Sequence, residues 1–303
     1  MDIHDVLVVG AGPAGLTAAT YLARFHRRVL VADGGAPRAS WIPRSHNAPG
    51  FPAGVGGDEI LGRMRAQAER YGAEILTGRV EALGGTDGEF AARLDGAPVR
   101  ARKVLLATGV VDRHPDLPGV ERAIERGLVR ICPICDAFEA SDSAIAVIGD
   151  GDSGAREAAF LRTYSDRVTL IHTGRPDALG ARAEMARLGV AVVDAPIEAV
   201  ALDGDRVTAL TWGGEARRFD VVYSALGCTP SADLARDLGA ALDAEGRLTT
   251  DAHQQTSIPG LYAAGDVVRG LNQIAVATGE AALAATDIHN RLREAEGLVV
   301  AGG

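Results

Sequence analysis

Two cysteines separated by two residues, Cys132 and Cys135, are followed directly by an acidic residue, Asp136. Cysteines at this spacing can close into a small, reducible disulfide ring, and a neighbouring acid can exchange a proton with a departing thiolate. Pro133 suits the first position of a helix, which would place Cys132 near the helix N-cap and lower the pKa of its thiol. The pattern predicts a redox-active pair.

The alternative for such a pair is one half of a zinc site, which needs two further ligands. The third cysteine of the chain, Cys228, lies far along the sequence, and no histidine pair at metal-binding spacing accompanies it. We therefore expect no metal. We expect Cys228 to be a small buried residue, because a free cysteine behaves as a hydrophobic side chain.

A glycine-rich loop at residues 10–15 has the surroundings that dinucleotide binding requires. It follows a short β-branched run at 6–9 and precedes a predicted helix at 16–24. The next predicted strand, 29–32, ends in Asp33, where the ribose of a bound dinucleotide needs an acceptor. These features predict a β-α-β unit that holds a diphosphate at its helix N-terminus.

A second glycine-rich loop at residues 149–154 repeats this arrangement, and it is the internal repeat of the chain. Strands are predicted at 145–148 and 168–171, with a helix at 155–163 between them. Other predicted elements are a helix at 58–71, a strand at 104–109, a proline-containing linker at 111–120, strands near 190–193, 207–210 and 221–225, and a helix at 274–289. The fold class is therefore α/β with two Rossmann-like dinucleotide-binding domains.

Composition narrows the classes of function. The chain has 303 residues, enough for two domains, and a net charge of −9, so it lacks the basic surface that attracts nucleic acid or anionic membranes. No apolar run reaches the roughly 18 residues of a membrane helix, and the N-terminus lacks the basic segment of a signal peptide. With only three cysteines, we expect a cytoplasmic protein without a structural disulfide framework.

Four further segments carry a resemblance to a known family: Asn47-Ala-Pro-Gly-Phe-Pro52, Ala107-Thr-Gly109, Gly265-Asp266 and Asn272-Gln-Ile-Ala275. Together with the two loops and the Cys-x-x-Cys-Asp motif, they resemble the low-molecular-weight thioredoxin reductase family over nearly the whole chain. The resemblance implies an FAD domain that is split around an inserted domain of the pyridine-nucleotide type. We expect the FAD domain at 1–113 and 241–303 and the inserted domain, with its cysteine pair, at 114–240.

The resemblance also implies roles for individual residues. Cys135 would be the sulfur nearest the flavin, Cys132 the thiol that meets the substrate, and Asp136 the acid/base. The residues expected to bind FAD are Gly10, Gly12, Pro13, Ala14, Gly15, Asp33, Asn47, Val80, Ala107, Thr108, Gly109, Gly265, Asp266, Asn272, Gln273 and Ile274. The family further implies a homodimer, hinges near 110–118 and 240–250, and a partner that is a thioredoxin-like protein disulfide or a small dithiol or disulfide.

The chain departs from this family where NADPH binds. Family members place His-Arg-Arg and a further arginine after the second strand of the inserted domain, whereas here the segment reads His172-Thr173-Gly174-Arg175. Asp150 also adds negative charge where a diphosphate belongs. The possible nucleotide loop consists of Gly149, Gly151, Asp152, Ser153 and Arg175. Use of NADPH or NADH is therefore left open.

The flavin side departs as well, since Trp41 and His46 stand where the family has Gly-Gly-Gln. Trp41 would either stack near the flavin or fill the shortened loop, and His46 would be either a second acid/base or a loop residue bonded to backbone. The leading interpretation is a thioredoxin reductase-like enzyme with FAD. The alternatives are an enzyme that takes electrons from a donor other than NADPH, a dithiol oxidase that passes electrons to oxygen, and a non-catalytic flavin redox sensor, which would not need Cys132, Cys135 and Asp136 together.

Overall fold

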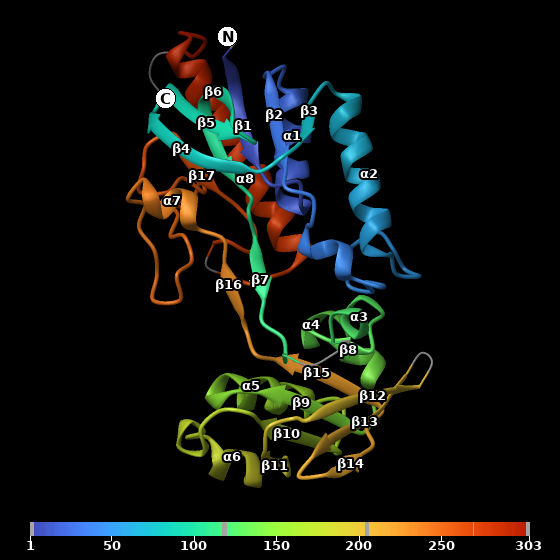
Figure 1. The fold of residues 1–303 in the computed structure, drawn as a ribbon. Helices are drawn as coiled ribbons and strands as arrows, with labels where there is room; N and C mark the ends of the chain where they lie inside the picture. The colour runs from blue at the N-terminus through green and yellow to red at the C-terminus, as the bar shows by residue number, and fades with distance from the viewer. Residues whose placement is uncertain (1–2, 117–119, 204–205, 269, 301–303) are drawn as a thin grey trace.

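The computed structural model describes residues 3–116, 120–203, 206–268 and 270–300. It shows two α/β bodies, one above the other, which are joined by a narrow two-stranded ribbon (Figure 1). Both chain ends lie at the far end of the upper body, away from the ribbon (Figure 1).

The upper body is built on a seven-stranded sheet in the order β3-β2-β1-β6-β5-β4, with β17 paired to β6. Its strands are β1 (His4–Val9), β2 (Val29–Asp33), β3 (Glu74–Thr77), β4 (Val80–Thr86), β5 (Glu89–Leu94), β6 (Ala97–Leu106) and β17 (Leu261–Ala263). Strands β3, β2, β1, β6 and β17 are parallel, and β5 runs antiparallel to β4 and β6. The runs 6–9 and 29–32 are buried on both faces of the sheet, as covered parallel strands must be.

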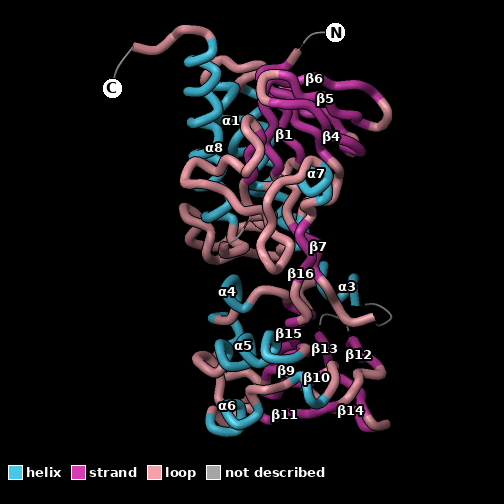
Figure 2. Tube along the Cα trace, turned by 90° about the vertical axis from the view of Figure 1, so that its left-hand side faces the viewer, coloured by secondary structure: helices cyan, strands magenta, loops and turns pink. Residues whose placement is uncertain are grey.

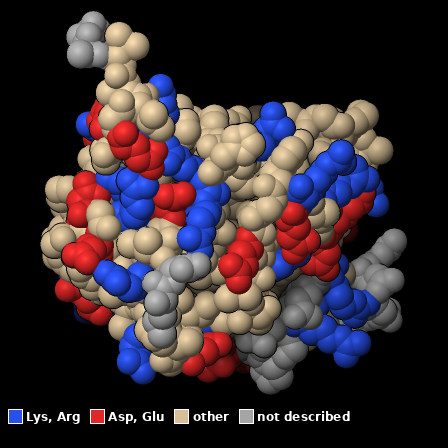
Figure 3. Space-filling model, turned by 90° about the horizontal axis from the view of Figure 1, so that it is seen from above, with Lys and Arg blue, Asp and Glu red and all other residues tan. Residues whose placement is uncertain are grey.

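Helices cover both faces of this sheet. They are α1 (Pro13–Arg24), α2 (Gly57–Arg70) and α8 (Ile274–Ala295) on one face and α7 (Asp233–Asp237) on the other, with the short 3-10 helix η1 (Arg38–Trp41) after β2. Helices α1 and α8 pack through small side chains, among them Ala19 and Ala281. At the end of the body seen from above, basic and acidic side chains are interspersed (Figure 3), and Arg27 and Arg102 both pair with Glu296.

The lower body has a five-stranded parallel sheet in the order β11-β10-β9-β15-β8. Its strands are β8 (Val129–Arg130), β9 (Ile145–Gly149), β10 (Val168–His172), β11 (Ala191–Asp194) and β15 (Val221–Ala225). The antiparallel strands β12 (Ala199–Asp203), β13 (Arg206–Trp212) and β14 (Glu215–Arg217) form a second sheet. The helical elements are α3 (Val120–Glu125), α4 (Pro133–Asp136), η2 (Phe138–Ala140), α5 (Gly151–Leu161), η3 (Pro176–Ala178) and α6 (Arg182–Arg187).

Strands β7 (Val110–Asp112) and β16 (Cys228–Pro230) pair antiparallel and carry the chain between the bodies (Figure 2). Directly after β16, Ala232 and Ala235 enter the core of the upper body, and Leu248 is fully buried there. The return crossing therefore lies earlier than the linker at 240–250 that the sequence suggested. The small apolar side chains that follow β16 belong to the core of the upper body.

Candidate active site

A cavity of about 550 Å³ opens where the carboxyl ends of β1, β2 and β6 meet, and it extends to the cysteine pair of the lower body. Ligands of open parallel sheets bind at this edge. Every residue expected to bind FAD lines the cavity except Gly15, and Cys132, Cys135 and Asp136 line it too. Segments that are far apart in the sequence, the first at residue 10 and the last at residue 274, therefore line one cavity.

The first glycine-rich loop shapes one wall of this cavity. Gly10 has φ 109°, and a Cβ there would lie 2.3 Å from the carbonyl oxygen of Ala107. A Cβ on Gly15 would lie 1.8 Å from the carbonyl oxygen of Gly10, so the lack of a side chain at Gly15 lets α1 pack closely against the end of β1. Gly12 is the N-cap of α1, and no atom lies within 4 Å of the place where its Cβ would be. The free backbone N–H groups of α1 thus face open space, and this cradle fits a diphosphate.

Asp33 ends β2 at the same edge and is 9 % exposed. Its Oδ1 accepts a hydrogen bond from the backbone N–H of Gly35 at 3.0 Å, and its Oδ2 pairs with Arg65 of α2. The carboxylate is thereby fixed at the cavity wall, in the place that a ribose hydroxyl requires.

Arg38 is a cavity residue that the sequence analysis did not single out. Its guanidinium binds both carboxylate oxygens of Asp112 on β7, at 2.6 and 2.9 Å, and lies 3.3 Å from Asp266 Oδ2. Burial raises the pKa of Asp266, and Arg38 acts against that rise. Arg38 thus places a positive charge between two acids beside a site shaped for an anionic cofactor. The sequence signal for it is an arginine five residues after the acidic end of β2.

Cys132 and Cys135 form a disulfide with a Cα–Cα distance of 5.3 Å. As expected, Cys132 is the N-cap and Pro133 the first residue of the single-turn helix α4. Gln273 Nε2 lies 3.4 Å from each sulfur atom, and Gln273 Oε1 accepts a hydrogen bond from Asn47 Nδ2 at 2.8 Å. Two residues predicted to bind the cofactor therefore hold the disulfide against the cavity.

Asp136 follows the disulfide and is held by two neighbours. The hydroxyl of Tyr223 donates a hydrogen bond to Asp136 Oδ1 at 2.7 Å, and Arg130 Nη1 donates to the Asp136 carbonyl at 2.9 Å. Burial raises the pKa of the Asp136 carboxyl, and Arg130 and Tyr223 act against that rise. A carboxyl with a raised pKa beside a disulfide is suited to donating a proton.

The second glycine-rich loop has the same close packing as the first, since a Cβ on Gly149 would lie 2.7 Å from the Cα of Gly154. The opening of the second loop, between Asp150 and Gly174, differs from that of the first. A Cβ on Gly174 would lie only 1.8 Å from Asp150 Oδ1, so the Asp150 carboxylate lies beside the residues that follow β10. Asp152 is also engaged, because its Oδ1 accepts a hydrogen bond from the backbone N–H of Ala181 at 3.0 Å.

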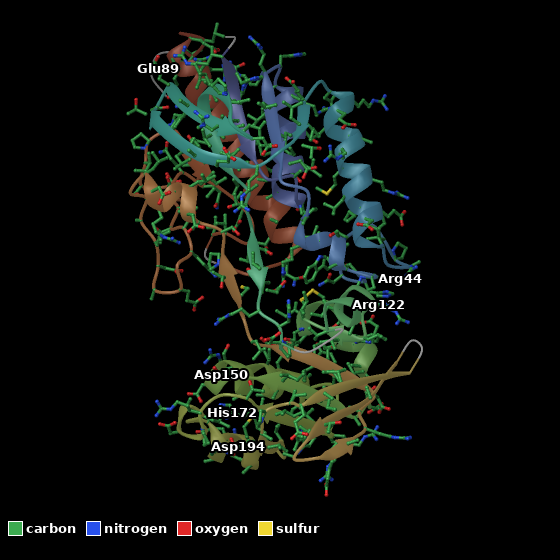
Figure 4. All side chains as sticks on the ribbon, viewed as in Figure 1. Arg44, Glu89, Arg122, Asp150, His172 and Asp194 are labelled. Carbon is green, nitrogen blue, oxygen red and sulfur yellow. A yellow bond between two sulfur atoms is a disulfide. The ribbon has the colours of Figure 1, made fainter. Side chains whose placement is uncertain are left out.

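Side chains at the ends of β10 and β11 are bound to acids of this chain. His172 is fully buried, with Nδ1 3.1 Å from Asp194 Oδ1 and Nε2 3.6 Å from Asp150 Oδ1 (Figure 4). Arg182 of α6 binds the same Asp194. Arg175, which the sequence analysis proposed for the nucleotide loop, is 83 % exposed and pairs with Asp177 instead. Sequence reasoning missed Arg182 of α6, which the fold brings to Asp194 at the end of β11.

The remaining residues of interest have definite places. Trp41 lines the cavity and also packs against the core of the lower body. His46 is exposed and does not line the cavity. Cys228 is partly exposed in β16, where Arg247 Nη2 approaches its sulfur to 3.5 Å, so it is not the fully buried residue that we expected. The described residues contain no cluster of side chains suited to a metal ion, and none of their helices is long and apolar enough to cross a membrane.

Comparison with known proteins gives consistent matches. The family model of the pyridine nucleotide-disulphide oxidoreductases matches residues 4–281. The thioredoxin reductase of Listeria monocytogenes is 33% identical over 309 residues, covering 96% of this chain and 95% of that protein. The thioredoxin reductase of Streptomyces coelicolor is 36% identical over 306 residues, covering 94% and 93%. The crystal structure of thioredoxin reductase from Streptococcus pyogenes superposes with a TM-score of 0.88 at 29% identity, covering 96% and 99%.

Proposed function

From its membership of the low-molecular-weight thioredoxin reductase-like group of the pyridine nucleotide-disulphide oxidoreductases, which makes this chain an FAD-dependent thiol–disulfide oxidoreductase, we propose how it works. Cys132 and Cys135 exchange electrons with an external disulfide or dithiol. NADPH serves poorly as the electron donor. The observation that carries the proposal is Gln273, which lies on the wall of the FAD cavity and contacts both sulfur atoms.

In this proposal FAD is held by the residues that shape the cavity. Gly10 and Gly12 would present the N-terminus of α1 to the diphosphate, and Asp33 would accept a hydrogen bond from a ribose hydroxyl. Asp266 and Arg38 line the same cavity. When bound, FAD supplies the two electrons that reduce the Cys132–Cys135 disulfide, or accepts them when the flow is reversed.

The dithiol then carries out thiol–disulfide exchange. The Cys132 thiolate attacks one sulfur of the substrate disulfide, that bond breaks, and the departing thiolate takes a proton from Asp136. Cys135, as a thiolate, next attacks the Cys132 sulfur of the mixed disulfide and releases the second substrate thiolate. The substrate gains two electrons, and the Cys132–Cys135 disulfide is formed again. The partly buried carboxyl of Asp136, with its raised pKa, supports the acid role.

The weak use of NADPH is inferred from the mouth of the second loop. Asp150 fills the space beside Gly174, and Arg182 and His172 are bound to Asp194. An incoming 2′-phosphate therefore meets the acids Asp150 and Asp194, and Arg182 is already paired with Asp194, in place of the free arginines of the family. Each hydrogen bond to a charged group contributes roughly 1.5–3 kcal/mol, so losing two weakens binding by about two to four orders of magnitude.

The same observation favours a second candidate function, oxidation of a dithiol. In that direction the substrate dithiol reduces the Cys132–Cys135 disulfide and leaves as a disulfide. Bound FAD would supply the route by which the two electrons reach O₂, so that one H₂O₂ would be formed for each dithiol oxidised. No pyridine nucleotide is needed for this reaction, which agrees with the acidic second loop. Formation of H₂O₂ with a dithiol substrate distinguishes it from disulfide reduction.

The partners and organisation complete the proposal. The relatives are thioredoxin reductases by name, which supports a thioredoxin-like protein disulfide as partner beside a small dithiol or disulfide. A homodimer and a cytoplasmic location are proposed from the family resemblance and the cysteine usage. For the domains, we place the boundaries of the inserted unit at β7 and β16, because the residues directly after β16 pack in the upper body.

Anaerobic reduction of the purified FAD-loaded protein tests this function. We expect a dithiol to bleach the flavin absorbance faster than micromolar NADPH or NADH, with little difference between the two nucleotides. Fast bleaching by NADPH and clearly slower bleaching by NADH would restore a conventional NADPH-driven reductase. Bleaching by no dithiol, in a protein that retains both cysteines, would refute the cysteine relay.

A further inference from the structure

Arg130 and Tyr223 form a pair beside Asp136 that neither the motif nor the proposed chemistry uses. They lie on the neighbouring strands β8 and β15, directly opposite each other in the parallel register. The Tyr223 hydroxyl donates to Asp136 Oδ1 at 2.7 Å, and Arg130 Nη1 lies 3.3 Å from the same hydroxyl. Arg130 Nε lies 3.7 Å from Asp136 Oδ2, so one carboxylate oxygen accepts a hydrogen bond and the other lies near a positive charge.

The surroundings make this arrangement specific. Tyr223 is fully buried, whereas the Arg130 and Asp136 side chains are 21 % and 26 % exposed. A phenylalanine would fill the same place in the core, so the hydroxyl of Tyr223 is explained by its bond to Asp136 and not by packing. The other charged group that acts on Asp136 is Glu139 of η2, a like charge that favours the protonated carboxyl, as burial does.

We propose that Arg130 and Tyr223 are positioning residues that orient the Asp136 carboxyl toward the disulfide and set the pH at which it releases its proton. The inference rests on the proposed function, in which Asp136 protonates the departing thiolate. The hydrogen bond from Tyr223 and the positive charge of Arg130 both favour the carboxylate over the neutral carboxyl, and so they offset the effect of burial and of Glu139. The acid thereby remains able both to give its proton and to take one back in the next turnover.

A direct titration of Asp136 tests the pair without relying on turnover. In the reduced, FAD-loaded protein, the infrared band of the protonated Asp136 carboxyl is followed against pH and is assigned by its loss in Asp136→Asn. We expect Tyr223→Phe and Arg130→Met each to raise the pKa of Asp136 by about one pH unit, because the first removes a hydrogen bond to the carboxylate and the second removes a nearby positive charge. Arg130→Lys keeps the charge and should recover much of the wild-type value, and it also serves if Arg130→Met does not fold.

Tyr262→Phe is the matched control. Tyr262 is equally buried and donates to Asp287 Oδ2 at 2.6 Å, but it lies in the upper body and does not line the cavity. It should leave the pKa of Asp136 unchanged. An unchanged Asp136 pKa in both Tyr223→Phe and Arg130→Met, or an equal shift in Tyr262→Phe, would overturn the inference.

A kinetic experiment separates this inference from the proposed function on which it rests. The reduced protein is mixed with an alkyl disulfide, whose thiolate needs a proton to leave, and with an aromatic disulfide, whose thiolate leaves unprotonated. Asp136→Asn should slow the first reaction and spare the second. Tyr223→Phe should move the alkaline limb of the alkyl reaction upward by about one pH unit and leave the aromatic reaction unchanged. If Asp136→Asn spares both reactions, the acid role fails and this inference fails with it, whereas a shifted limb in Tyr223→Phe supports both.

Discussion

Gln273 lies at the same distance from both sulfur atoms, and the two cysteines differ in the elements around them. Cys132 begins α4 as its N-cap, where the helix N–H groups favour a thiolate, whereas Cys135 lies within the turn. The family pattern assigns substrate exchange to Cys132 and the flavin-facing position to Cys135. At the scale of single residues, this assignment stays a prediction.

Serine variants of the two cysteines test it. In Cys132→Ser the remaining Cys135 thiolate should give a long-wavelength absorption band beside oxidised FAD, because it is the sulfur assigned to the flavin. Cys135→Ser should lack this band and should keep a Cys132 thiol that alkylating reagents modify readily. Absorption spectra and alkylation rates at neutral pH measure both properties. The opposite pattern would exchange the two roles.

At the scale of elements, the mouth of the second loop shows how one side chain can close a binding site. Asp150 is the N-cap of α5 and extends toward Gly174, which has no side chain to oppose it. Gly174→Arg alone should not gain NADPH binding, because its Cβ would meet Asp150 Oδ1. Asp150→Gly with Gly174→Arg should bind NADPH at least tenfold more tightly than the wild type, through one new charge-assisted bond and one repulsion removed.

Fluorescence titration with NADPH and NADH measures this gain, and NADH is the internal control because it lacks the 2′-phosphate. Equal gains for both nucleotides would show that the arginine does not reach the phosphate. A full gain from Gly174→Arg alone would show that Asp150 does not close the site.

Glu157 on α5 gives a prediction about pH. Burial raises its pKa to about 7, and Oε2 has no hydrogen-bond partner among the described residues. The folded state therefore binds the proton more tightly than the unfolded chain, and stability decreases as pH rises from about 4.3 to 7. Glu157→Gln should be more stable than the wild type at pH 8, by about 1–3 kcal/mol, and nearly equal to it at pH 4.5. Thermal unfolding at the two pH values measures the difference, and an equal effect at both would contradict the raised pKa.

At the scale of the whole molecule, contacts from the upper body hold the lower one in place. Trp41 of η1 packs against the core of the lower body, and a Cβ on Gly127 would lie 2.8 Å from Cγ of Pro43. Any reorientation of the inserted unit about β7 and β16 must first separate these contacts. The shortened loop that carries Trp41 is therefore expected to set how often the bodies move apart.

Trp41→Ala tests this expectation by amide hydrogen exchange. Exchange in β7 and β16 should become faster by about tenfold or more, because burying a large apolar side chain stabilises the closed arrangement by about 1.5–3 kcal/mol. The control is Trp212→Ala, which truncates a tryptophan that packs in the same cluster but comes from the lower body itself. Similar exchange at the ribbon in both variants would show that Trp41 does not hold the bodies together.

The sequence by itself determined the α/β fold class, the elements around the two glycine-rich loops and the Cys132–Cys135 pair. Strands 6–9 and 29–32, the loop glycines and the N-cap position of Cys132 depend on neighbouring residues, so their patterns could be interpreted directly, and the matched family and structures confirm the α/β fold class. Boundaries were less secure. The strand predicted at 104–109 ends at Leu106, where the chain turns to line the cavity, and the hairpin of β4 and β5 was not predicted, since glycines weaken the alternation of β4.

Only the tertiary structure decided which distant residues meet. Gln273 contacts the disulfide, Arg130 and Tyr223 share Asp136, and Asp150 crosses to Gly174. The hydrophobic pattern within one element does not predict these side-chain contacts, because each contact depends on how strands and helices far apart in the chain pack together. For the same reason, the sequence analysis predicted Arg175 as the remaining nucleotide-binding cation. In the structure the Arg175 side chain is exposed to solvent, and Arg182 lies at the end of β11 instead.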